Sequence, residues 1–311
     1  MSVALRVESP GLFTTIQDLG RPNAMSAGVS RGGAMDRFAH SAANLLVGND
    51  AGAATLECTL TGPHLVAERA LLLAITGGDL EPSINGRPAP QWAGFFVSAG
   101  DHITFGARRA GARTYIAVAG GVIGDRWLGS ASTNLMAARG GMQGRALTSG
   151  DTLQAGDPPA EPVAAGRSLD EGLRPPYGGH TLHAIAGPHV QRLGTEGKSL
   201  LFASAFEVAI DANRMGYRLK GPALDAPGDE LLSFGLTAGA LQLPSGGRPI
   251  LLMADCQTAG GYPVIATVVS AALPIAAQLS PGDQFRFAET DLEGALRMRR
   301  ERRAALDSLR A

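Results

Sequence analysis

The chain has 311 residues, of which 45% are hydrophobic, and this indicates a globular protein with enough chain for two domains. Only 18% of the residues are charged and the formal net charge is -1, which argues against nucleic-acid binding because phosphates need a basic surface. The two cysteines, Cys58 and Cys256, are too few for a disulfide framework or a zinc cluster.

The N-terminal sequence has no long apolar core and no small-residue cleavage site, so we expect no signal peptide. The most apolar window, residues 264–277, is interrupted by Ser270 and Pro274 and is too short to span a bilayer. We therefore expect a cytoplasmic protein without membrane contact. The 42 glycines and 19 prolines favour short strands joined by turns, and so a mainly β, β-rich α+β fold.

The N-terminal part begins with a strand pattern, since residues 3–7 alternate apolar and polar side chains. Asp18 and Arg21 follow, on either side of a glycine. They form either a surface ion pair or the two ends of a polar pocket.

A glycine-rich segment at residues 28–33 leads past Asp36 into an amphipathic helix, which Gly48 should end. A glycine loop before a helix can bind an anion. This loop lacks the Gly-Lys-Ser/Thr of a nucleoside-triphosphate loop and the context of a dinucleotide fingerprint, so its phosphate signal is weak.

Short strands and turns dominate residues 55–156, and Asn85-Gly86 predicts a hairpin turn. A polar loop there contains Ser130 and Ser132. Neither serine has the Gly-x-Ser-x-Gly surroundings of a nucleophile elbow, which disfavours a nucleophilic role. The best strand candidates are residues 70–75, 95–97, 102–105 and 115–119.

Residues 158–176 are rich in Pro, Ala, Glu and Gly and are typical of an interdomain linker. A second set of strands opens at residues 180–185, where His180 and His183 are more typical of strand histidines than of metal ligands. Residues 291–311 predict an Arg-rich helix with Asp291 as its N-cap and a solvated charged face.

An internal repeat relates the two halves and predicts two similar β-rich, barrel-like units. Its paired landmarks are residues 60–65 with 219–224, 76–80 with 237–241, 86–88 with 247–249, and 98–101 with 280–283. The second half carries an insert between Gly247 and Gly282 that the first half lacks. Because a shared scaffold does not need it, the insert is a natural place for function.

That insert contains residues 254–263, which follow a short apolar strand pattern and then turn polar. Gln257 and Thr258 offer hydrogen-bond donors and acceptors, and Gly260 and Gly261 would let a ligand approach the backbone closely. A tight turn that only ends the strand explains the same residues equally well.

Several longer motifs match a known family. The chain resembles the C subunit of bacterial 5-oxoprolinase, a family also described as allophanate hydrolase subunit 2 and as the carboxyltransferase-like part of urea amidolyase. The motifs that carry the resemblance are at residues 15–21, 32–36, 46–49, 129–133, 214–219 and 257–263.

The resemblance implies two cyclophilin-like β-barrel domains, which agrees with the repeat. We expect the first domain at residues 1–157, the linker at 158–176, the second domain at 177–290 and a C-terminal helix at 291–311. It also implies a heteromer with a B-type and an A-type partner, which uses ATP, with Mg, to open 5-oxo-L-proline to L-glutamate. The chain itself has no recognisable cofactor motif and no expected metal site, and we expect it to be inactive alone.

Two other functions fit the same resemblance. One is that of a regulatory protein that binds a kinase-inhibitor-like partner of the B type, and the other is that of a carboxyltransferase-like component of urea or allophanate metabolism. The family pattern usually has arginine at Cys256, an acid at Ala272 and Ser-Asp at Ala212-Asn213, so these positions depart from it.

Opening a lactam through a phosphorylated intermediate needs cations, and arginine binds phosphate or carboxylate in a planar fork. We expect some of the arginines, aspartates and polar residues to act as acids, as bases or in orienting other groups, and others to bind the substrate. For each Arg–Asp pair, the alternative is an ordinary salt bridge that locks a loop. The expected catalytic residues are Asp18, Arg21, Asp36 and Asp255, and the expected substrate-binding residues are Arg214, Arg218, Gln257, Thr258, Gly260, Gly261 and Tyr262.

Overall fold

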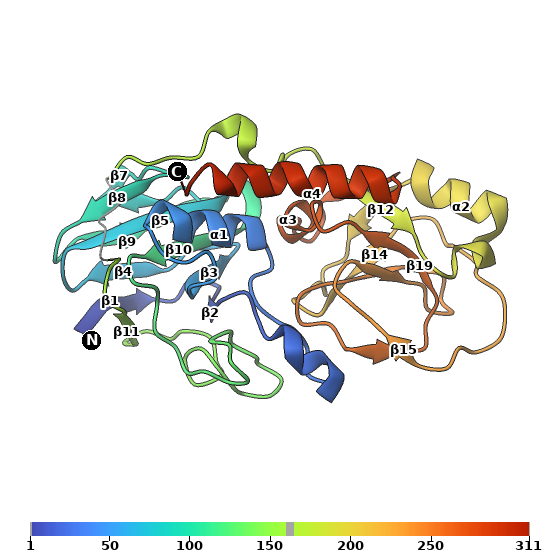
Figure 1. The fold of residues 1–311 in the computed structure, drawn as a ribbon, viewed down its shortest axis with the longest axis horizontal. Helices are drawn as coiled ribbons and strands as arrows, with labels where there is room; N and C mark the ends of the chain where they lie inside the picture. The colour runs from blue at the N-terminus through green and yellow to red at the C-terminus, as the bar shows by residue number, and fades with distance from the viewer. Residues whose placement is uncertain (1, 160–164, 311) are drawn as a thin grey trace. The chain divides into compact units, whose positions relative to one another are not determined.

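The computed structural model describes residues 2–159 and 165–310, which form two compact units. Of the described residues, the first unit contains 2–21, 32–159, 165–175 and 303–310, and the second contains Pro22–Arg31 and Pro176–Arg302. The fold is mainly β, as predicted, with few helices (Figure 1).

The first unit is built from two antiparallel sheets. The six-stranded sheet has the order β11-β1-β4-β9-β6-β7 and the five-stranded sheet has the order β2-β3-β10-β5-β8. The strands are β1 (Ser2–Ser9), β2 (Phe13–Gln17), β3 (Thr55–Thr59), β4 (His64–Ala67), β5 (Leu71–Asp79), β6 (Ser83–Ile84), β7 (Arg87–Pro88), β8 (Gly94–Val97), β9 (His102–Thr104), β10 (Ala110–Val118) and β11 (Thr152–Ala155). The strands of this β-rich unit are divided between these two sheets.

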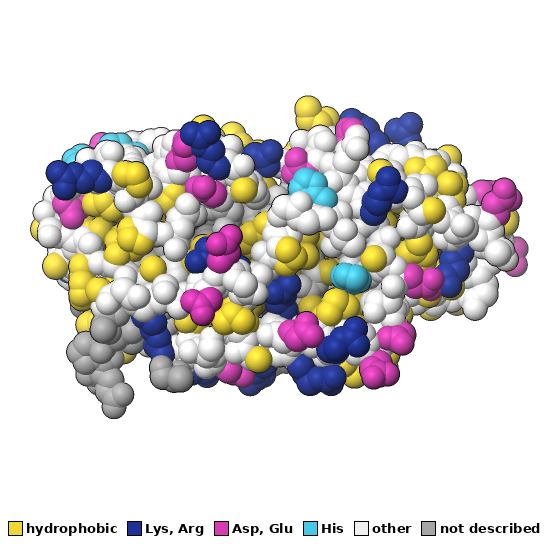
Figure 2. All heavy atoms as spheres, turned by 90° about the horizontal axis from the view of Figure 1, so that it is seen from above, with side chains coloured by type: hydrophobic (Ala, Val, Ile, Leu, Met, Phe, Trp, Pro, Cys, Tyr) yellow, Lys and Arg dark blue, Asp and Glu magenta, His cyan; other side chains and the backbone are white. Residues whose placement is uncertain are grey.

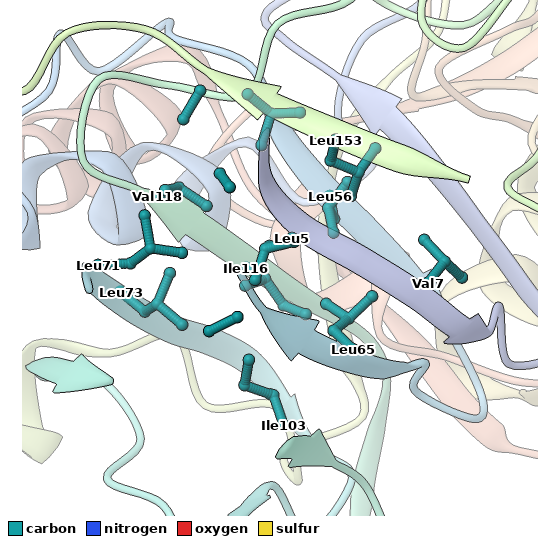
Figure 3. Close-up of a cluster of buried hydrophobic side chains, with 14 of the residues drawn as sticks. Leu5, Val7, Leu56, Leu65, Leu71, Leu73, Ile103, Ile116, Val118 and Leu153 are labelled. Carbon is teal, nitrogen blue, oxygen red and sulfur yellow. The ribbon is translucent and has the colours of Figure 1, made fainter. Parts of the chain in front are cut away.

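The core of this unit lies between the sheets, because buried apolar side chains come from both (Figure 3). Leu5 and Leu65 project from the six-stranded sheet, while Leu73 and Ile116 project from the five-stranded one; all four are fully buried. Burying a Leu or Ile side chain is worth about 1.5–3 kcal/mol, so this cluster is a main source of the unit's stability.

Helix α1 (Arg37–Leu46) packs on the five-stranded sheet through β5 and β10. Asp36 is its N-cap, and its side chain accepts a hydrogen bond from the Ala39 N–H at 2.9 Å. Gly48, with φ 77, follows the last turn, as the sequence predicts. The Asn85-Gly86 hairpin is confirmed as well, since both residues have positive φ and lie between β6 and β7.

Part of the expected linker is tied to the first unit. The Gly166 N–H donates to Gly94 O at 2.8 Å, and the Leu169 N–H donates to Trp92 O at 2.9 Å. A one-turn 3₁₀ helix, η2 (Glu171–Leu173), follows. Residues 160–164 of the expected linker lie outside the described residues.

The second unit contains a closed seven-stranded barrel with the order β12-β19-β16-β17-β14-β13-β20. The barrel closes where β12 pairs in parallel with β20, and a separate two-stranded sheet joins β15 to β18. The strands are β12 (Thr181–Ala186), β13 (Ala205–Val208), β14 (Gly216–Lys220), β15 (Phe234–Gly235), β16 (Ala240–Gln242), β17 (Ile250–Leu252), β18 (Ala259–Gly260), β19 (Val264–Val268) and β20 (Gln284–Glu289).

Helix η1 (Pro22–Ala27) lies between β2 and α1 in sequence. The helices among and after the barrel strands are η3 (Val190–Leu193), α2 (Gly194–Ala203), α3 (Leu273–Ala277) and α4 (Leu292–Asp307). The Gly294 N–H donates to Asp291 Oδ1 at 2.8 Å, which confirms Asp291 as the cap of α4. Among the helices that the structure describes, none has the length and hydropathy needed to cross a membrane.

A shared turn supports the internal repeat. The carboxylate of Asp101 accepts from the Ser98 N–H at 2.7 Å, and that of Asp283 accepts from the Ser280 N–H at 2.9 Å. The glycines between them, Gly100 and Gly282, have φ 86 and 90. The Ser-x-Gly-Asp landmark is therefore one turn used in both units.

Candidate functional site

The family motifs of the N-terminal half converge in the first unit. The loop after β2 meets the glycine segment before α1, where the Ala34 N–H donates to Asp18 O at 2.9 Å. A Cβ on Gly33, which has φ 89, would stand 2.7 Å from Gly20 N, so only glycine permits this contact. The motif at residues 129–133 joins the same place through Ser130 and Ser132.

Asp18 is the centre of this cluster, and its carboxylate accepts four hydrogen bonds. The Ser130 and Ser132 hydroxyls donate at 2.6 Å each, and the Gly20 and Ala131 N–H groups donate at 2.7 Å each. Burial alone would raise the pKa of Asp18, but these hydrogen bonds outweigh it and hold the pKa below its usual range. An ionised carboxylate with a lowered pKa is a weak base, so the geometry favours Asp18 as a group that fixes the loops.

Arg21 is buried beside Asp18, with 2% of its surface exposed. Its guanidinium donates to Ser132 O and lies 5.0 Å from the centre of the Trp127 ring, within cation–π range. Asp18 and Arg21 therefore both contact Ser132, and they belong to a buried polar cluster instead of a surface ion pair.

Asp36 belongs to a second polar network beneath α1. Its N–H donates to the Tyr115 hydroxyl at 2.8 Å, and that hydroxyl donates to Glu57 Oε2 at 2.7 Å. The Met35 N–H donates to the same Glu57 oxygen at 2.8 Å. Burial, with the Glu57 charge second, raises the pKa of Tyr115 well above its usual value, so the phenol stays a donor. Asp36 thus caps and anchors the helix.

His40 lies in α1 and is fully buried. Its Nδ1 is 2.9 Å from Thr55 Oγ1, and its ring meets Tyr115 edge-on with centroids 6.2 Å apart. Burial lowers the pKa of His40 to about 4, which keeps the imidazole neutral near pH 7. Nothing in the sequence pattern of the helix distinguished this histidine from an ordinary core residue.

The motif at residues 46–49 also joins distant segments. Asn49 Nδ2 donates to Val118 O at 2.8 Å and to Asn44 Oδ1 at 3.0 Å, while Asn49 Oδ1 accepts from the Gly120 N–H at 2.8 Å. The side chain therefore fastens the end of α1 to the end of β10. Its role in this arrangement is structural.

In the second unit, the two remaining motifs meet at Arg214 and Asp255. Arg214 Nε donates to Asp255 Oδ2 at 2.8 Å and its Nη2 donates to Asp255 Oδ1 at 3.2 Å, which makes a bidentate pair. Only 8% and 13% of the two side chains are exposed. The Asp255 N–H also donates to Arg214 O at 2.9 Å, so the pair locks the entry of β14 to the exit of β17.

Cys256 packs among apolar side chains. It joins a buried cluster with Leu236, Leu252 and Val264. Burial, reinforced by the charge of Asp255, raises the pKa of Cys256 to about 11. A cysteine in this position adds apolar contact and no cation.

The other expected substrate-binding residues lie around the two-stranded β15–β18 sheet. Gln257 is exposed, and its Nε2 donates to Gln242 Oε1 at 3.0 Å. Gly260 lies in β18, while Thr258 holds the sheet by accepting the Leu236 N–H on its carbonyl at 2.8 Å. Gly261 and Tyr262 follow in the loop, and Tyr262 is half exposed.

Arg218 lies apart from this group. Its side chain is 67% exposed and its Nε pairs with Asp211 Oδ2 at 2.9 Å. Exposed ion pairs of this kind contribute about 0–1 kcal/mol to stability. Figure 2 shows acidic and basic side chains interspersed over one face of the molecule, in agreement with the near-neutral composition.

The structure thus offers a polar cluster in each unit. The first has a fully engaged carboxylate and a buried guanidinium. The second has a locked Arg–Asp pair and a hydrogen-bonded pair of glutamines. Glu57, Tyr115, His40 and Gln242 were not singled out by the sequence, because each resembles an ordinary residue of a strand or helix. Among the described residues, no group of three His, Cys, Asp or Glu side chains is placed to hold a metal ion.

Comparison with known families identifies one match. Residues 27–289 match the family described as "Carboxyltransferase domain, subdomain A and B". Two similar relatives are named as the C subunit of 5-oxoprolinase. The Escherichia coli (strain K12) protein is 36% identical over 98% of this chain and 97% of its own length, and the Haemophilus influenzae protein is 33% identical over 95% and 94%.

Larger proteins match as well. The urea amidolyase of Lachancea kluyveri is 30% identical over 98% of this chain, which spans 18% of that protein. Among solved structures, the K. lactis urea amidolyase superposes with a TM-score of 0.92 and 28% identity over 99% of this chain, which spans 20% of that one. The Kluyveromyces lactis urea carboxylase has the same TM-score and identity, and this chain spans 29% of it.

Proposed function

The chain belongs to the carboxyltransferase domain family, subdomains A and B, and we propose that it is the C subunit of an ATP-dependent 5-oxoprolinase, opening 5-oxo-L-proline to L-glutamate. Its relatives are components of enzyme systems named for 5-oxoproline and for urea. The observation that carries the proposal is the end-to-end match: the chain covers 97% of the E. coli relative but 18% of the L. kluyveri urea amidolyase.

The partners we propose are A-like and B-like proteins of the same enzyme system in a cytoplasmic complex, because the relatives are named as one subunit of a larger enzyme. Mg–ATP is proposed for the complex as a whole, where phosphorylation would turn the lactam oxygen into a leaving group. No step is assigned to a nucleotide on this chain, whose contribution we place in binding and orienting the lactam.

The two polar clusters support this division of roles. Asp18 accepts four hydrogen bonds and Asp255 accepts two from Arg214, so these carboxylates organise loops and are already engaged. The β15–β18 region of the second unit has side-chain amides with remaining hydrogen-bonding capacity. We therefore propose that the substrate is held in the second unit.

A second candidate is a carboxyltransferase-like component of urea or allophanate metabolism. It is favoured by the TM-score of 0.92 with the K. lactis urea amidolyase over 99% of the chain. This function would require a biotin-bearing partner and a carboxylated donor. The two candidates differ in substrate and in the proteins that must be present.

Co-expression with A-like and B-like proteins from the same organism tests the proposal. We expect glutamate release from 5-oxo-L-proline that depends on ATP and on all three chains, with little turnover by this chain alone. The same preparations are then given urea, bicarbonate and ATP with a biotinylated carrier. Urea-dependent ATP turnover without glutamate release would support the second candidate, and full activity of the isolated chain would contradict the role within a complex.

A further inference from the structure

One buried amide in the second unit points to a ligand. Gln242, the last residue of β16, is 1% exposed. Its Oε1 accepts the hydrogen bond from Gln257 Nε2 at 3.0 Å. Within residues 2–159 and 165–310, no group accepts a hydrogen bond from its Nε2, although that nitrogen carries two N–H donors. A buried N–H donor without a hydrogen-bond acceptor destabilises the folded state, and native proteins rarely keep one without a reason.

The surroundings of this nitrogen are apolar and fixed by the barrel. The register of β16 and β17 sets Gln242 opposite Ile250, so both side chains lie on the same face of the sheet. The neighbouring pair, Leu241 and Leu251, is fully buried on the other face. Ile250 packs against the apolar cluster that contains Leu236, so the surroundings of the amide offer little that could replace the missing acceptor.

A glycine lies against the amide pair. A Cβ added to Gly260 in β18 would stand 3.1 Å from Gln242 Nε2, 3.9 Å from Gln257 Nε2 and 2.9 Å from Leu236 Cδ1. Gly260 has no positive φ, so its backbone does not require glycine. Because Gly260 has no side chain, β18 can lie this close to the unpaired nitrogen. Gln257, which is hydrogen-bonded to Gln242, is exposed.

We propose that Gln242 binds the cis-amide edge of a lactam or ureido compound, with its Nε2 donating to the ligand carbonyl and its Oε1 accepting from the ligand N–H. A carboxamide carries a donor and an acceptor side by side, and a cyclic amide presents the complementary pair. Gln257 occupies one lone pair of Gln242 Oε1 and leaves the second for the ligand. Gln257 is a positioning residue, because its hydrogen bond fixes the orientation of the Gln242 amide. This inference rests on the proposed function for its substrate class.

Two small lactams test the proposal on the wild-type chain. Binding of 2-pyrrolidinone and of N-methyl-2-pyrrolidinone is measured by calorimetry or by NMR titration. The two differ at the lactam nitrogen, where methylation removes the N–H. We expect the N-methyl compound to bind about tenfold or more weakly, because a site built to bond an N–H discriminates against its loss. Equal affinities, or no binding of 2-pyrrolidinone, would overturn the proposal.

Variants locate the site. Gln242→Glu keeps the side-chain shape and removes the donor, and it should weaken 2-pyrrolidinone binding about tenfold or more. Gly260→Ala should weaken it too, because the added methyl group would crowd Nε2 at 3.1 Å. Gln278→Glu, at a buried glutamine that follows α3 in the same unit, is the matched control and should leave binding unchanged. Melting temperatures report folding, and the two-lactam comparison stands even if a variant does not fold.

The outcomes separate this inference from the proposed function. If the assembled complex turns over 5-oxoproline and Gln242→Glu leaves its KM unchanged, the function stands and the inference fails. If the complex shows no such turnover but 2-pyrrolidinone or urea binding depends on Gln242, the inference stands and the function fails.

Discussion

Asp18 and Ser132 hold each other through two hydrogen bonds of opposite direction. The Ser132 hydroxyl donates to Asp18 Oδ1 at 2.6 Å, and the same hydroxyl oxygen accepts from the Asp18 N–H at 3.0 Å. Residues 114 positions apart in sequence are thereby joined at a buried point. Stability at low pH should depend on this contact.

Asp18→Asn should destabilise the chain at neutral pH by about 1–3 kcal/mol, because donors aimed at a carboxylate lose their acceptor. The folded-state pKa of Asp18 is below the value of about 3.9 of a free carboxyl, so its stabilisation is complete above that pH and is lost as pH falls through the folded pKa. Urea unfolding from pH 7 downward measures the effect. In Asp18→Asn, the free energy of unfolding should fall less steeply at acid pH than in the wild type. Asp225→Asn, at an exposed position, controls for the lost charge. The same decline of stability at acid pH in Asp18→Asn as in the wild type would contradict this role of Asp18.

His40 should lower the stability of the folded chain over a pH range above the one in which Asp18 acts. Its folded pKa is about 4, against about 6.5 for a free histidine, so the unfolded chain binds a proton first as pH falls. Stability should decline from about pH 6.5 to about pH 4, by at most about 1.4 kcal/mol per pH unit from this residue. His40→Gln should remove that slope in urea unfolding. If the slope between these pH values persists in the variant, His40 is not its source.

Arg214→Met should destabilise the chain by about 3–5 kcal/mol, because it leaves the Asp255 carboxylate buried without its bidentate partner. Adding Asp255→Leu should recover much of that loss, since an apolar pair replaces the ion pair. A double-mutant cycle by chemical denaturation measures the coupling. If the stable double variant assembles but supports no turnover, the pair has a role beyond structure, whereas retained activity assigns it to the fold.

Both thiols should be unreactive in the folded chain. Burial raises the pKa of Cys58 to about 12, and burial with the nearby Asp255 charge raises that of Cys256 to about 11. The thiolate is the reactive form, so 5,5′-dithiobis(2-nitrobenzoate) at pH 8 should label neither thiol until denaturant is added. Labelling that is complete within minutes in native buffer would show that one of them is accessible. Cys256→Ser is the variant that identifies which.

Arg218→Ala should change the free energy of unfolding by less than about 1 kcal/mol, because its partner Asp211 is exposed as well. A loss of activity in the assembled complex would therefore report directly on substrate or partner binding. Lys220→Ala, which removes another exposed strand cation paired with Glu207, is the matched control. Equal activity of the two variants would remove Arg218 from the substrate-binding residues.

Features set by neighbouring residues were predictable from the sequence. The Asn85-Gly86 turn, the Asp291 cap and the Ser-x-Gly-Asp turns depend on a few adjacent residues whose conformations are restricted. The mainly β fold was predicted from the density of turns, and the matching turns support the repeat. Arg214 and Asp255 were both identified as functional candidates, and the structure pairs them.

Contacts between distant residues were not predictable in this way. Tyr115 and Glu57 are 58 positions apart, and each lies in a strand whose pattern shows only that it is buried. The unpaired amide of Gln242 follows from what surrounds it in three dimensions, so a strand glutamine carries no signal by itself. The arrangement of the first unit as two sheets depends on strand pairing, which composition does not specify.

The parallel pairing of β12 with β20 has a consequence for biosynthesis. Thr181 pairs with Arg286, so the barrel can close only after about a hundred further residues have left the ribosome. Until then the edge of β12 presents free N–H and C=O groups that other chains can pair with. Nascent chains stalled before β20 should therefore be prone to aggregation and should be bound by ribosome-associated chaperones.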